Sequence, residues 1–343
     1  MSLAPGPPLR ELFDSGLGAF LAAQDTRIRG TRRNRWIVLL GGLALAGAIL
    51  AWVVVGEIGN DLVPMAGFAI AVGAILFFRF ATAEIADDVR HRMMAGIAPL
   101  LGLEYEPRAD GFDLSRFDLL GLTAYEKVTR SDRLRGVFDG ISVELMAARL
   151  ASVSTSGIGD KRETHTVERF SGLLLRVTDP APTAARFRLV PPAIPGETSV
   201  LNDISIVTHT TAPDSMMLSM DEAEQMLAAT AEAAPPTPTG DAVFDARFEL
   251  HAKDAELPAA LSRLDAETRA ALLDIAANFD GGPVSVGFDH GDILFAFITR
   301  RRFEIGPLRP PMAQFGRLEH LAAQMTVLSL IAERLRATQA APR

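Results

Sequence analysis

The feature that most constrains this chain is a run from Trp36 to Val55 that contains no charged side chain. A helix of about 20 residues spans about 30 Å, which is the thickness of the hydrocarbon core of a bilayer. A second apolar run, residues 62–78, follows a short polar break at residues 56–61. The two runs predict a transmembrane helical hairpin, residues 36–81, with the lipid bilayer as its partner. A cleavable signal peptide would have a shorter apolar core.

Arginines flank both apolar runs, and none lies in the break between them. By the positive-inside rule, segments rich in arginine stay in the cytoplasm. The hairpin would therefore place both termini in the cytoplasm, and we expect a multi-pass protein of the plasma membrane. The residues that set this topology are Arg27, Arg29, Arg32, Arg33, Arg35, Arg79, Arg90 and Arg92.

The chemistry of the two runs favours an anchor over a transporter. Neither contains Asp, Glu, Lys, Arg or His, the residues that mark ion and substrate pathways in membranes. Small residues recur four positions apart, as in Gly42 with Ala46 and Gly67 with Ala71. This spacing allows close helix packing within the hairpin or between copies. The general abundance of alanine and glycine explains the pattern equally well.

Amphipathic segments flank the hairpin on both sides. In residues 1–35, Leu9, Leu12 and Leu17 recur at helical spacing, so this segment lies at the membrane surface or packs against the protein's own domain. In residues 82–118, Ile85 and Val89 begin a four-residue repeat, which predicts a juxtamembrane helix that continues the second apolar run outward.

Residues 119–230 form the first β-rich part. Alternating apolar residues on both sides of Asp139 and Gly140 predict a hairpin with a two-residue turn. Further strands are expected at 167–177 and 186–190, and Ser219 with Glu222 predicts a short helix to residue 228. The stretch 231–240, rich in proline, alanine and threonine, is interpreted as a linker.

Residues 241–343 form a second α+β part. Alternation predicts a strand over 244–250, Pro258 and Asp265 each begin a helix, and two strands at 284–288 and 293–297 flank a turn at His290 and Gly291. A long helix closes the chain at 314–336. The predicted fold class is therefore α+β: the helical hairpin, then a mainly antiparallel β-sheet domain with a long C-terminal helix. The pattern leaves open whether the strands before and after the linker form one sheet or two.

The C-terminal helix carries more apolar surface than one core requires. Its seam, expected to pack on the sheet, consists of Leu318, Leu321, Met325, Leu328, Ala332 and Leu335. Val327 and Ile331 widen this arc, and Leu330 lies outside it. We hypothesise that Val327 and Leu330 contact a second copy or a protein partner. The alternative is that they lie under the sheet or a loop.

Several residues within 120–305 form a recognisable pattern: Tyr125, Asp132, Gly136, Asp139, Gly140, Val143, Glu144, Phe170 to Leu173 (FSGL), Phe244, Phe248, Asp254 and Leu261 to Leu273. In this pattern the chain resembles a domain-of-unknown-function family of uncharacterised bacterial membrane proteins with N-terminal transmembrane helices. The resemblance implies a bacterial inner-membrane location, a cytoplasmic α+β domain and no assigned activity. Where family members more often have Leu-Thr-Pro, this chain has Leu261, Ser262 and Arg263, so the match is loose there.

Few residues point to chemistry. The chain has no cysteine and lacks a phosphate-loop, nucleophile-elbow or zinc-protease motif, and its net charge of -8 disfavours nucleic acid as a partner. His165 and His209 each lie in a Thr-His-Thr triplet, and two paired strands could bring them together at a metal, although exposed strand histidines are commoner. Arg300, Arg301 and Arg302 could contact an anionic group, although a solvated strand end is commoner. We expect no cofactor.

Two classes of function remain open. The first, which we favour, is a membrane-anchored cytoplasmic binding or scaffold module. The second is a membrane-associated enzyme with dispersed catalytic residues, for which no catalytic residue can be named. A small subunit of an envelope complex is a third, weaker interpretation. A cluster of titratable groups converging in a pocket would favour the enzyme.

Overall fold

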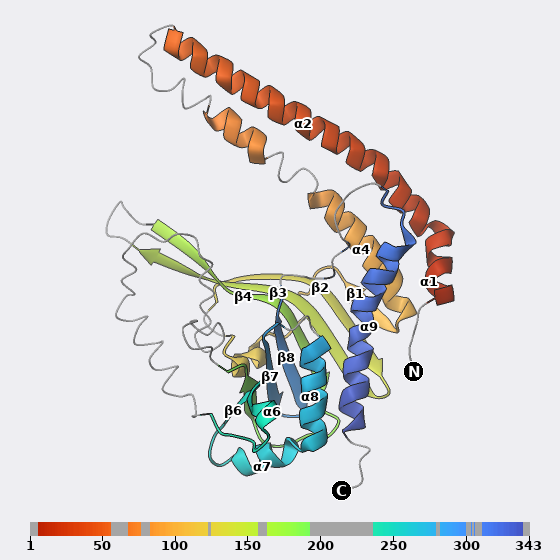
Figure 1. The fold of residues 1–343 in the computed structure, drawn as a ribbon, viewed down its shortest axis with the longest axis vertical. Helices are drawn as coiled ribbons and strands as arrows, with labels where there is room; N and C mark the ends of the chain where they lie inside the picture. The colour runs from red at the N-terminus through yellow and green to blue at the C-terminus, as the bar shows by residue number, and fades with distance from the viewer. Residues whose placement is uncertain are drawn as a thin grey trace. The chain divides into compact units, whose positions relative to one another are not determined.

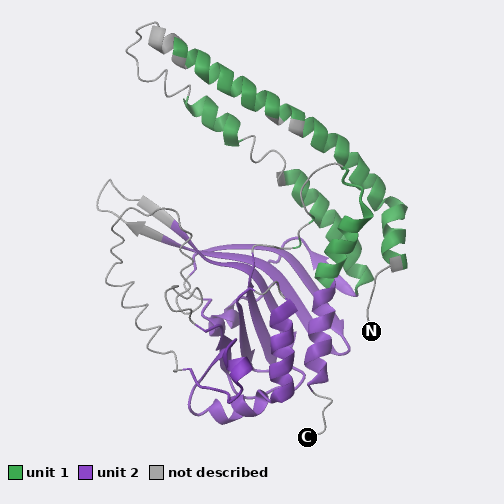
Figure 2. Cartoon of the chain, in the orientation of Figure 1, with its two compact units in different colours: residues 1–101, 303–325 green, residues 102–302, 326–343 purple. Residues whose placement is uncertain are grey.

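The computed structural model describes residues 6–55, 68–76, 83–122, 125–156, 163–192, 236–278, 282–299, 303, 305 and 311–338. The chain divides into two compact units, which Figure 2 shows in different colours. The first comprises residues 1–101 and 303–325, and the second comprises residues 102–302 and 326–343.

The described helices of the N-terminal part of the first unit are α1 (Gly6–Leu12), the π-helical turn η1 (Phe13–Leu17), α2 (Gly18–Val55), a helix at 68–76, and α4 (Ala83–Leu100). Gly16 adopts a φ of 150° inside η1, which breaks the helical path between α1 and α2. A residue with a side chain would be strained in that conformation. The chain therefore bends where the sequence has a glycine.

The apolar face of the N-terminal segment packs inside the first unit. Leu9 and Leu21 are buried, as are Met93 and Ile97 of α4. The side chain of Leu12 would lie 3.2 Å from a Cβ added at Gly96, which shows how closely α1 approaches α4. For residues 1–35, the alternatives were a position at the membrane surface and packing against the protein's own chain. This burial favours packing.

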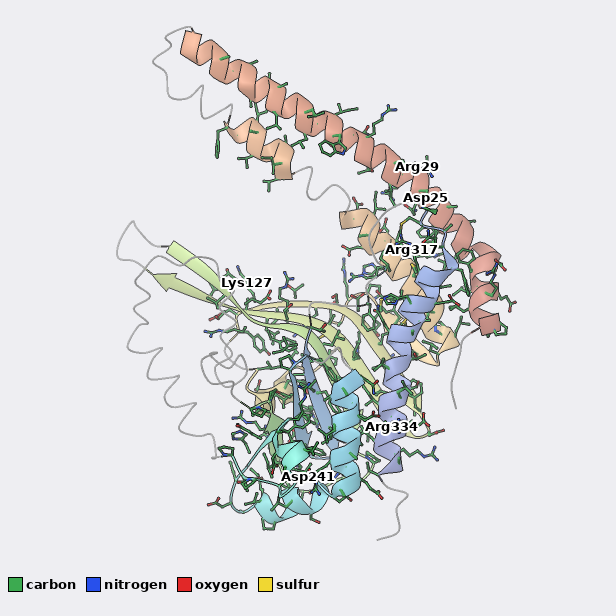
Figure 3. All side chains as sticks on the ribbon, viewed as in Figure 1. Asp25, Arg29, Lys127, Asp241, Arg317 and Arg334 are labelled. Carbon is green, nitrogen blue, oxygen red and sulfur yellow. The ribbon has the colours of Figure 1, made fainter. Side chains whose placement is uncertain are left out.

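Residues 303–325 also belong to this unit and pack against its N-terminal helices. The rings of Phe13 and Phe315 meet edge to face with their centroids 5.7 Å apart. The backbone N–H of Met312 donates to the carboxylate of Asp25 over 2.7 Å (Figure 3). Arg317 donates to the carbonyl of Ile305. The segment is thus fixed to the N-terminal helices by both apolar and polar contacts.

The prediction of a multi-pass inner-membrane location with both termini cytoplasmic is wrong. Within the described ranges, no helix combines the length and the apolarity needed to cross a membrane. The first apolar run is the continuation of α2, a helix of 38 residues whose earlier part carries the arginines. The described part of the second run, residues 68–76, is also helical.

The two apolar runs nevertheless approach each other closely at a small residue. A Cβ added at Gly42 would lie 2.6 Å from Cβ of Ala74, in the helix at 68–76. Ala46, one turn beyond Gly42, is buried, and so is Ala74. The spacing of small residues therefore marks the contact between the two helices.

The second unit contains one antiparallel sheet of eight strands in the order β1-β2-β3-β4-β8-β7-β5-β6 (Figure 1). This confirms an α+β chain with an antiparallel sheet and a C-terminal helix. The strands are β1 (Leu103–Glu106), β2 (Lys127–Phe138), β3 (Ile141–Ser156), β4 (Glu163–Thr178), β5 (Phe187–Val190), β6 (Glu249–Ala252), β7 (Val284–Asp289) and β8 (Asp292–Ile298).

Both predicted tight turns are present. Asp139 and Gly140 have φ values of 50° and 87° between β2 and β3, and His290 and Gly291 have 45° and 87° between β7 and β8. Positive φ at both central residues matches the right-handed twist of the paired strands. Because the first turn has two residues, Phe138 in β2 lies directly opposite Ile141 in β3.

The strands before and after the linker belong to the same sheet. β4 pairs with β8 from Gly172 opposite Ile298 to Thr178 opposite Asp292. β5 lies between β7 and β6, so it also joins the two parts of the sequence. The predicted helix at 219–228 and the first half of the linker, residues 231–235, lie outside the described residues.

Short helices and α9 complete the second unit. α6 (Ala242–Asp245), α7 (Leu257–Arg263) and α8 (Ala266–Asn278) follow one another, and α9 (Phe315–Ala337) begins in the first unit and ends in the second. The strand expected over 244–250 is instead α6 followed by β6. Asp241 caps α6 by accepting from the backbone N–H groups of Val243 and Phe244, which fixes a helical turn.

A buried ion pair connects the end of β4 to α7. Arg263 donates to both carboxylate oxygens of Asp179, over 2.7 and 3.2 Å, and to the hydroxyl of Thr268 over 2.8 Å. The side chains of Arg263 and Asp179 are 7% and 2% exposed. The guanidinium also lies 5.2 Å from the ring centroid of Phe288 in β7. One side chain thus joins three elements.

The apolar seam of α9 is buried along its whole length, but only part of it belongs to the unit that contains the sheet. Leu318, Leu321 and Met325 belong to the first unit, whereas Leu328, Ala332 and Leu335 belong to the second. Leu330 is 47% exposed, which confirms that it lies outside the buried arc.

Candidate functional site

One register position crosses the entire sheet and has a charged residue or a histidine on six of the eight strands. Read from β1 to β6, the residues directly opposite one another are Glu104, Arg135, Glu144, Arg176, Leu294, Gly287, Arg188 and His251. Residues directly opposite in neighbouring strands project from the same face of a sheet. We call this set the charged row.

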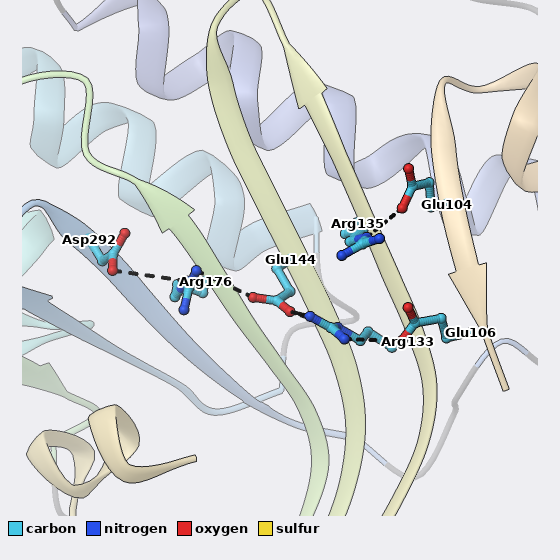
Figure 4. A network of polar contacts seen from close by, with 7 residues as sticks. All are labelled: Glu104, Glu106, Arg133, Arg135, Glu144, Arg176 and Asp292. Carbon is cyan, nitrogen blue, oxygen red and sulfur yellow. Dashed lines mark hydrogen bonds and ion pairs between the residues drawn. The ribbon is translucent and has the colours of Figure 1, made fainter. Parts of the chain in front are cut away.

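Ion pairs join Glu144 and Arg176 of the charged row to neighbouring residues in a network, and Glu104 with Arg135 forms a separate pair beside it (Figure 4). Arg133 donates to Glu144 over 2.7 Å and to Glu106 over 3.0 Å. Arg176 lies 3.6 Å from the other oxygen of Glu144 and 3.9 Å from Asp292. Arg135 pairs with Glu104, and Arg116 pairs with Asp292. Acid and base therefore alternate across five strands.

The network lies on the face of the sheet that is turned away from α8 (Figure 4). The 3-10 helix η2 (Ser115–Leu120) lies on the network side and closes a core over the other end of the same face. Along β3, for example, the charged Glu144 is followed on this face by Met146, Ala148 and Leu150, all in that core. The face is thus divided into an apolar part and a charged part.

Burial and hydrogen bonding act on the pKa values of this network. Burial alone would lower the pKa of the Arg133 guanidinium, but hydrogen bonds to Glu144 and Glu106 outweigh it and raise the pKa. Burial raises the pKa of the Asp292 carboxyl, and the guanidinium groups of Arg176 and Arg116 offset part of that rise. Glu144 is 8% exposed, accepts a hydrogen bond from Arg133 and forms an ion pair with Arg176 on its other side. Burial of this carboxylate is stabilised by its two partners.

This arrangement suits recognition and rigidity more than proton transfer. A general base needs a carboxylate that can reach a substrate proton. Here Glu144 and Asp292 are each engaged by two arginines. The network therefore presents an ordered pattern of alternating charge on one side of the sheet.

The arginines predicted to set a membrane topology occupy varied places in the first unit. Arg27 pairs with Asp88 over 3.4 Å, and Arg90 pairs with Asp87 over 3.1 Å. The guanidinium of Arg92 lies 6.0 Å from the ring centroid of Phe20. Arg29 and Arg33 are exposed on α2. Arg79 and the side chains of Arg32 and Arg35 lie outside the described part.

The other predicted site residues lie mostly outside the described residues. His165 belongs to β4, where it is opposite Ser154, but its side chain is outside the described part. His209 and Arg300 to Arg302 are also outside it. Among the side chains that the structure describes, no group of three or more His, Asp or Glu residues could hold a metal ion.

Sequence reasoning missed the charged row. Its signal was present, because Arg133 and Arg135 in β2, and Glu104 and Glu106 in β1, are spaced two apart and so share a face. The register that joins them to Arg176 and Asp292 depends on the pairing of distant strands, which no local pattern specifies.

A second surface lies where α8 and α9 run beside each other. A shallow pocket of about 210 Å³ is lined by Asp274, Ile275, Asn278, Val327, Leu330, Ile331 and Arg334. Arg334 (Figure 3) pairs with Asp274 over 2.8 Å at its rim, and their side chains are 60% and 42% exposed. The surface combines an apolar floor with a charged rim.

Comparisons of the chain with protein-family models, curated proteins and solved structures gave no match. The two surfaces are therefore interpreted from their own chemistry.

Proposed function

We propose that this protein is a protein-binding or scaffold module, and that the surface formed by α8 and α9 is its docking surface. The observation that carries the proposal is Leu330, a leucine that is 47% exposed beside the pocket that it helps to line. Buried apolar anchors surrounded by polar rims provide most of the affinity of protein interfaces. The proposed occupant is a second copy of this chain.

Self-complementarity supports a second copy as the occupant. A two-fold contact joins the same surface of each molecule, so it requires a projection and a matching recess on one patch. Leu330 is the projection, and the apolar floor of Ile275, Val327 and Ile331 is the recess. Each Leu330 would enter the pocket of the other molecule.

The rim charges support the same occupant. Asp274 and Arg334 are of opposite sign, half exposed and within 2.8 Å of each other. A two-fold axis through the pocket would let Asp274 of one copy meet Arg334 of the other. Such exchange adds specificity and orientation to the apolar contact.

Leu330→Glu in the full chain is expected to weaken self-association by about 2 kcal/mol, since it places a charge in an apolar contact. Light scattering at several concentrations measures the mass, and circular dichroism reports folding. Leu261→Glu is the matched control, because Leu261 is also an exposed leucine, 37% accessible, on a helix of the same unit. A folded Leu330→Glu protein with the parent's mass at all concentrations would contradict the proposal.

A mixing experiment tests the two-fold exchange directly. Asp274→Arg leaves two positive charges at the rim, and Arg334→Asp leaves two negative charges there. Each variant alone is expected to be monomeric because like charges oppose each other across the axis. An equimolar mixture should form a heterodimer, since both positive charges of the first variant would then face negative charges of the second. A mixture that stays monomeric would exclude this geometry.

A further inference from the structure

The charged row contains one arginine that differs from its neighbours. On this face, Arg116, Arg133, Arg135, Arg176 and Arg186 each have a carboxylate oxygen within 4.0 Å. Within the part of the chain that the structure describes, no ion pair or hydrogen bond engages the side chain of Arg188. Burial lowers the pKa of its guanidinium, and no carboxylate of the described residues offsets that effect.

The two carboxylates closest to Arg188 in register are directed elsewhere. Glu249 lies two residues from His251, the residue opposite Arg188, and its carboxylate is 3.6 Å from Nε2 of that histidine. Asp289 lies two residues from Gly287, the other residue opposite Arg188, and pairs with Arg186 over 3.3 Å. Among the described side chains, Arg188 is thus surrounded by charges but has no ion-pair partner.

The surroundings of Arg188 partly exclude water. A Cβ added at Gly287 would lie 3.0 Å from side-chain atoms of both Leu119 and Leu120. These leucines therefore close over the strand beside Arg188, while Val190 is buried next to it on the same face. A partly desolvated guanidinium without a counter-charge is unfavourable, and an anion that reaches it gains a stronger interaction than it would in water.

We propose that Arg188 is the central residue of a binding site for a small oxyanion, with His251 beside it on the edge strand β6. The guanidinium offers a planar fork of donors that fits two oxygens of a phosphate or carboxylate group. The site is independent of the surface formed by α8 and α9. The ligand class is an oxyanion with at least two accessible oxygens.

Position along the row separates this site from the ion-paired network. Leu294 and Gly287 lie between Arg176 and Arg188 in register. Three strand spacings correspond to about 14 Å, so the carboxylate of Glu144, which lies one strand further away, is too far to serve Arg188. The row therefore changes, towards β6, from internal ion pairs to an arginine available for a ligand.

Phosphate binding to the full chain tests the proposal. The probe is sodium phosphate, titrated by isothermal calorimetry and by melting temperature, with sodium chloride adjusted to hold ionic strength constant. Phosphate is expected to raise the melting temperature of the parent in a saturable way, whereas chloride at equal ionic strength should not. Acetate and phenyl phosphate are parallel arms that distinguish a carboxylate from a phosphate monoester.

Three variants assign the effect to Arg188. Arg188→Met should weaken phosphate binding at least tenfold, and Arg188→Lys should weaken it about threefold because a point charge replaces the fork. Arg186→Met is the matched control. It removes an equal charge from the residue just before β5, but one already paired to Asp289, and it should change affinity less than twofold. If Arg188→Met fails to fold, the phosphate affinities of Arg188→Lys and Arg186→Met test the proposal. No saturable binding by the parent, or equal binding by Arg188→Lys and the parent, overturns the proposal.

Discussion

Replacing Arg263 with methionine is expected to lower the free energy of unfolding of the sheet-containing unit by about 3–5 kcal/mol. The methionine keeps the aliphatic stem but leaves the carboxylate of Asp179, 2% exposed, without its guanidinium partner. It also removes the hydrogen bond to Thr268 and the contact with the ring of Phe288. An uncompensated buried charge is the main cost. Urea unfolding followed by circular dichroism measures the change.

Two controls separate this cost from loss of packing. Arg149→Met breaks an ion pair to Glu168 of similar length, 3.0 Å, but the arginine side chain is 58% exposed, so the loss should be below about 1 kcal/mol. The double variant Asp179→Asn with Arg263→Met removes both charges and should be markedly more stable than Arg263→Met alone. A double variant no more stable than Arg263→Met would mean that charge burial is not the cause.

The second large effect is expected at Gly172, inside β4. A Cβ there would lie 1.9 Å from the carbonyl oxygen of Phe297 in β8 and 2.9 Å from the ring of Phe170. The nearest obstacle is backbone, which cannot move without breaking the pairing of β4 with β8. Gly172→Ala should therefore destabilise the sheet by about 3 kcal/mol or more, at or above the upper end of the range for overpacking. Thermal melting followed by circular dichroism measures it.

Gly287→Ala is the matched control for Gly172→Ala. It is also a strand glycine in the same sheet, but a Cβ there would meet the tips of Leu119 and Leu120 at 3.0 Å. Side-chain tips can shift by a few tenths of an ångström, so we expect a loss of about 1 kcal/mol. Equal losses at both glycines would show that the backbone contact with Phe297 is not limiting.

Local signals in the sequence predicted the local features of the second unit. The pairs Asp139 with Gly140 and His290 with Gly291 specify tight turns because they tolerate positive φ, and both turns are present. The C-terminal helix and the exposure of Leu330 followed from helical periodicity. These features depend on residues a few positions apart.

The errors arose where several local interpretations were possible. Phe244 and Phe248 are four residues apart, which fits an alternating strand and a helical turn equally well. The hydrogen bonds that the Asp241 side chain accepts from backbone N–H groups stabilise the helical turn here. For the apolar runs, composition gave no information on helix boundaries: α2 begins at Gly18, well before the first run.

The candidate site could not be predicted, because it depends on register between distant strands. Glu144 and Arg176 become neighbours when β3 pairs with β4, and Arg188 joins the same row through β7 and β8. A slip of one residue in any of these pairings would move the corresponding side chain to the other face. Sequence alone indicated the charges and their spacing within strands, but not their alignment across the sheet.

The pairing of β4 with β8 has a consequence for the order in which the sheet forms. The hairpins β2–β3 and β7–β8 join residues close in sequence and can form early. The contact of Gly172 with Ile298 must close a loop whose described residues include β5, β6, β7 and the helices α6, α7 and α8, so it carries a larger entropic cost. Non-local pairing of this kind slows folding. Until β4 pairs with β8, each of these strands has one edge without a partner. Newly made chains are then most exposed to association through these edges.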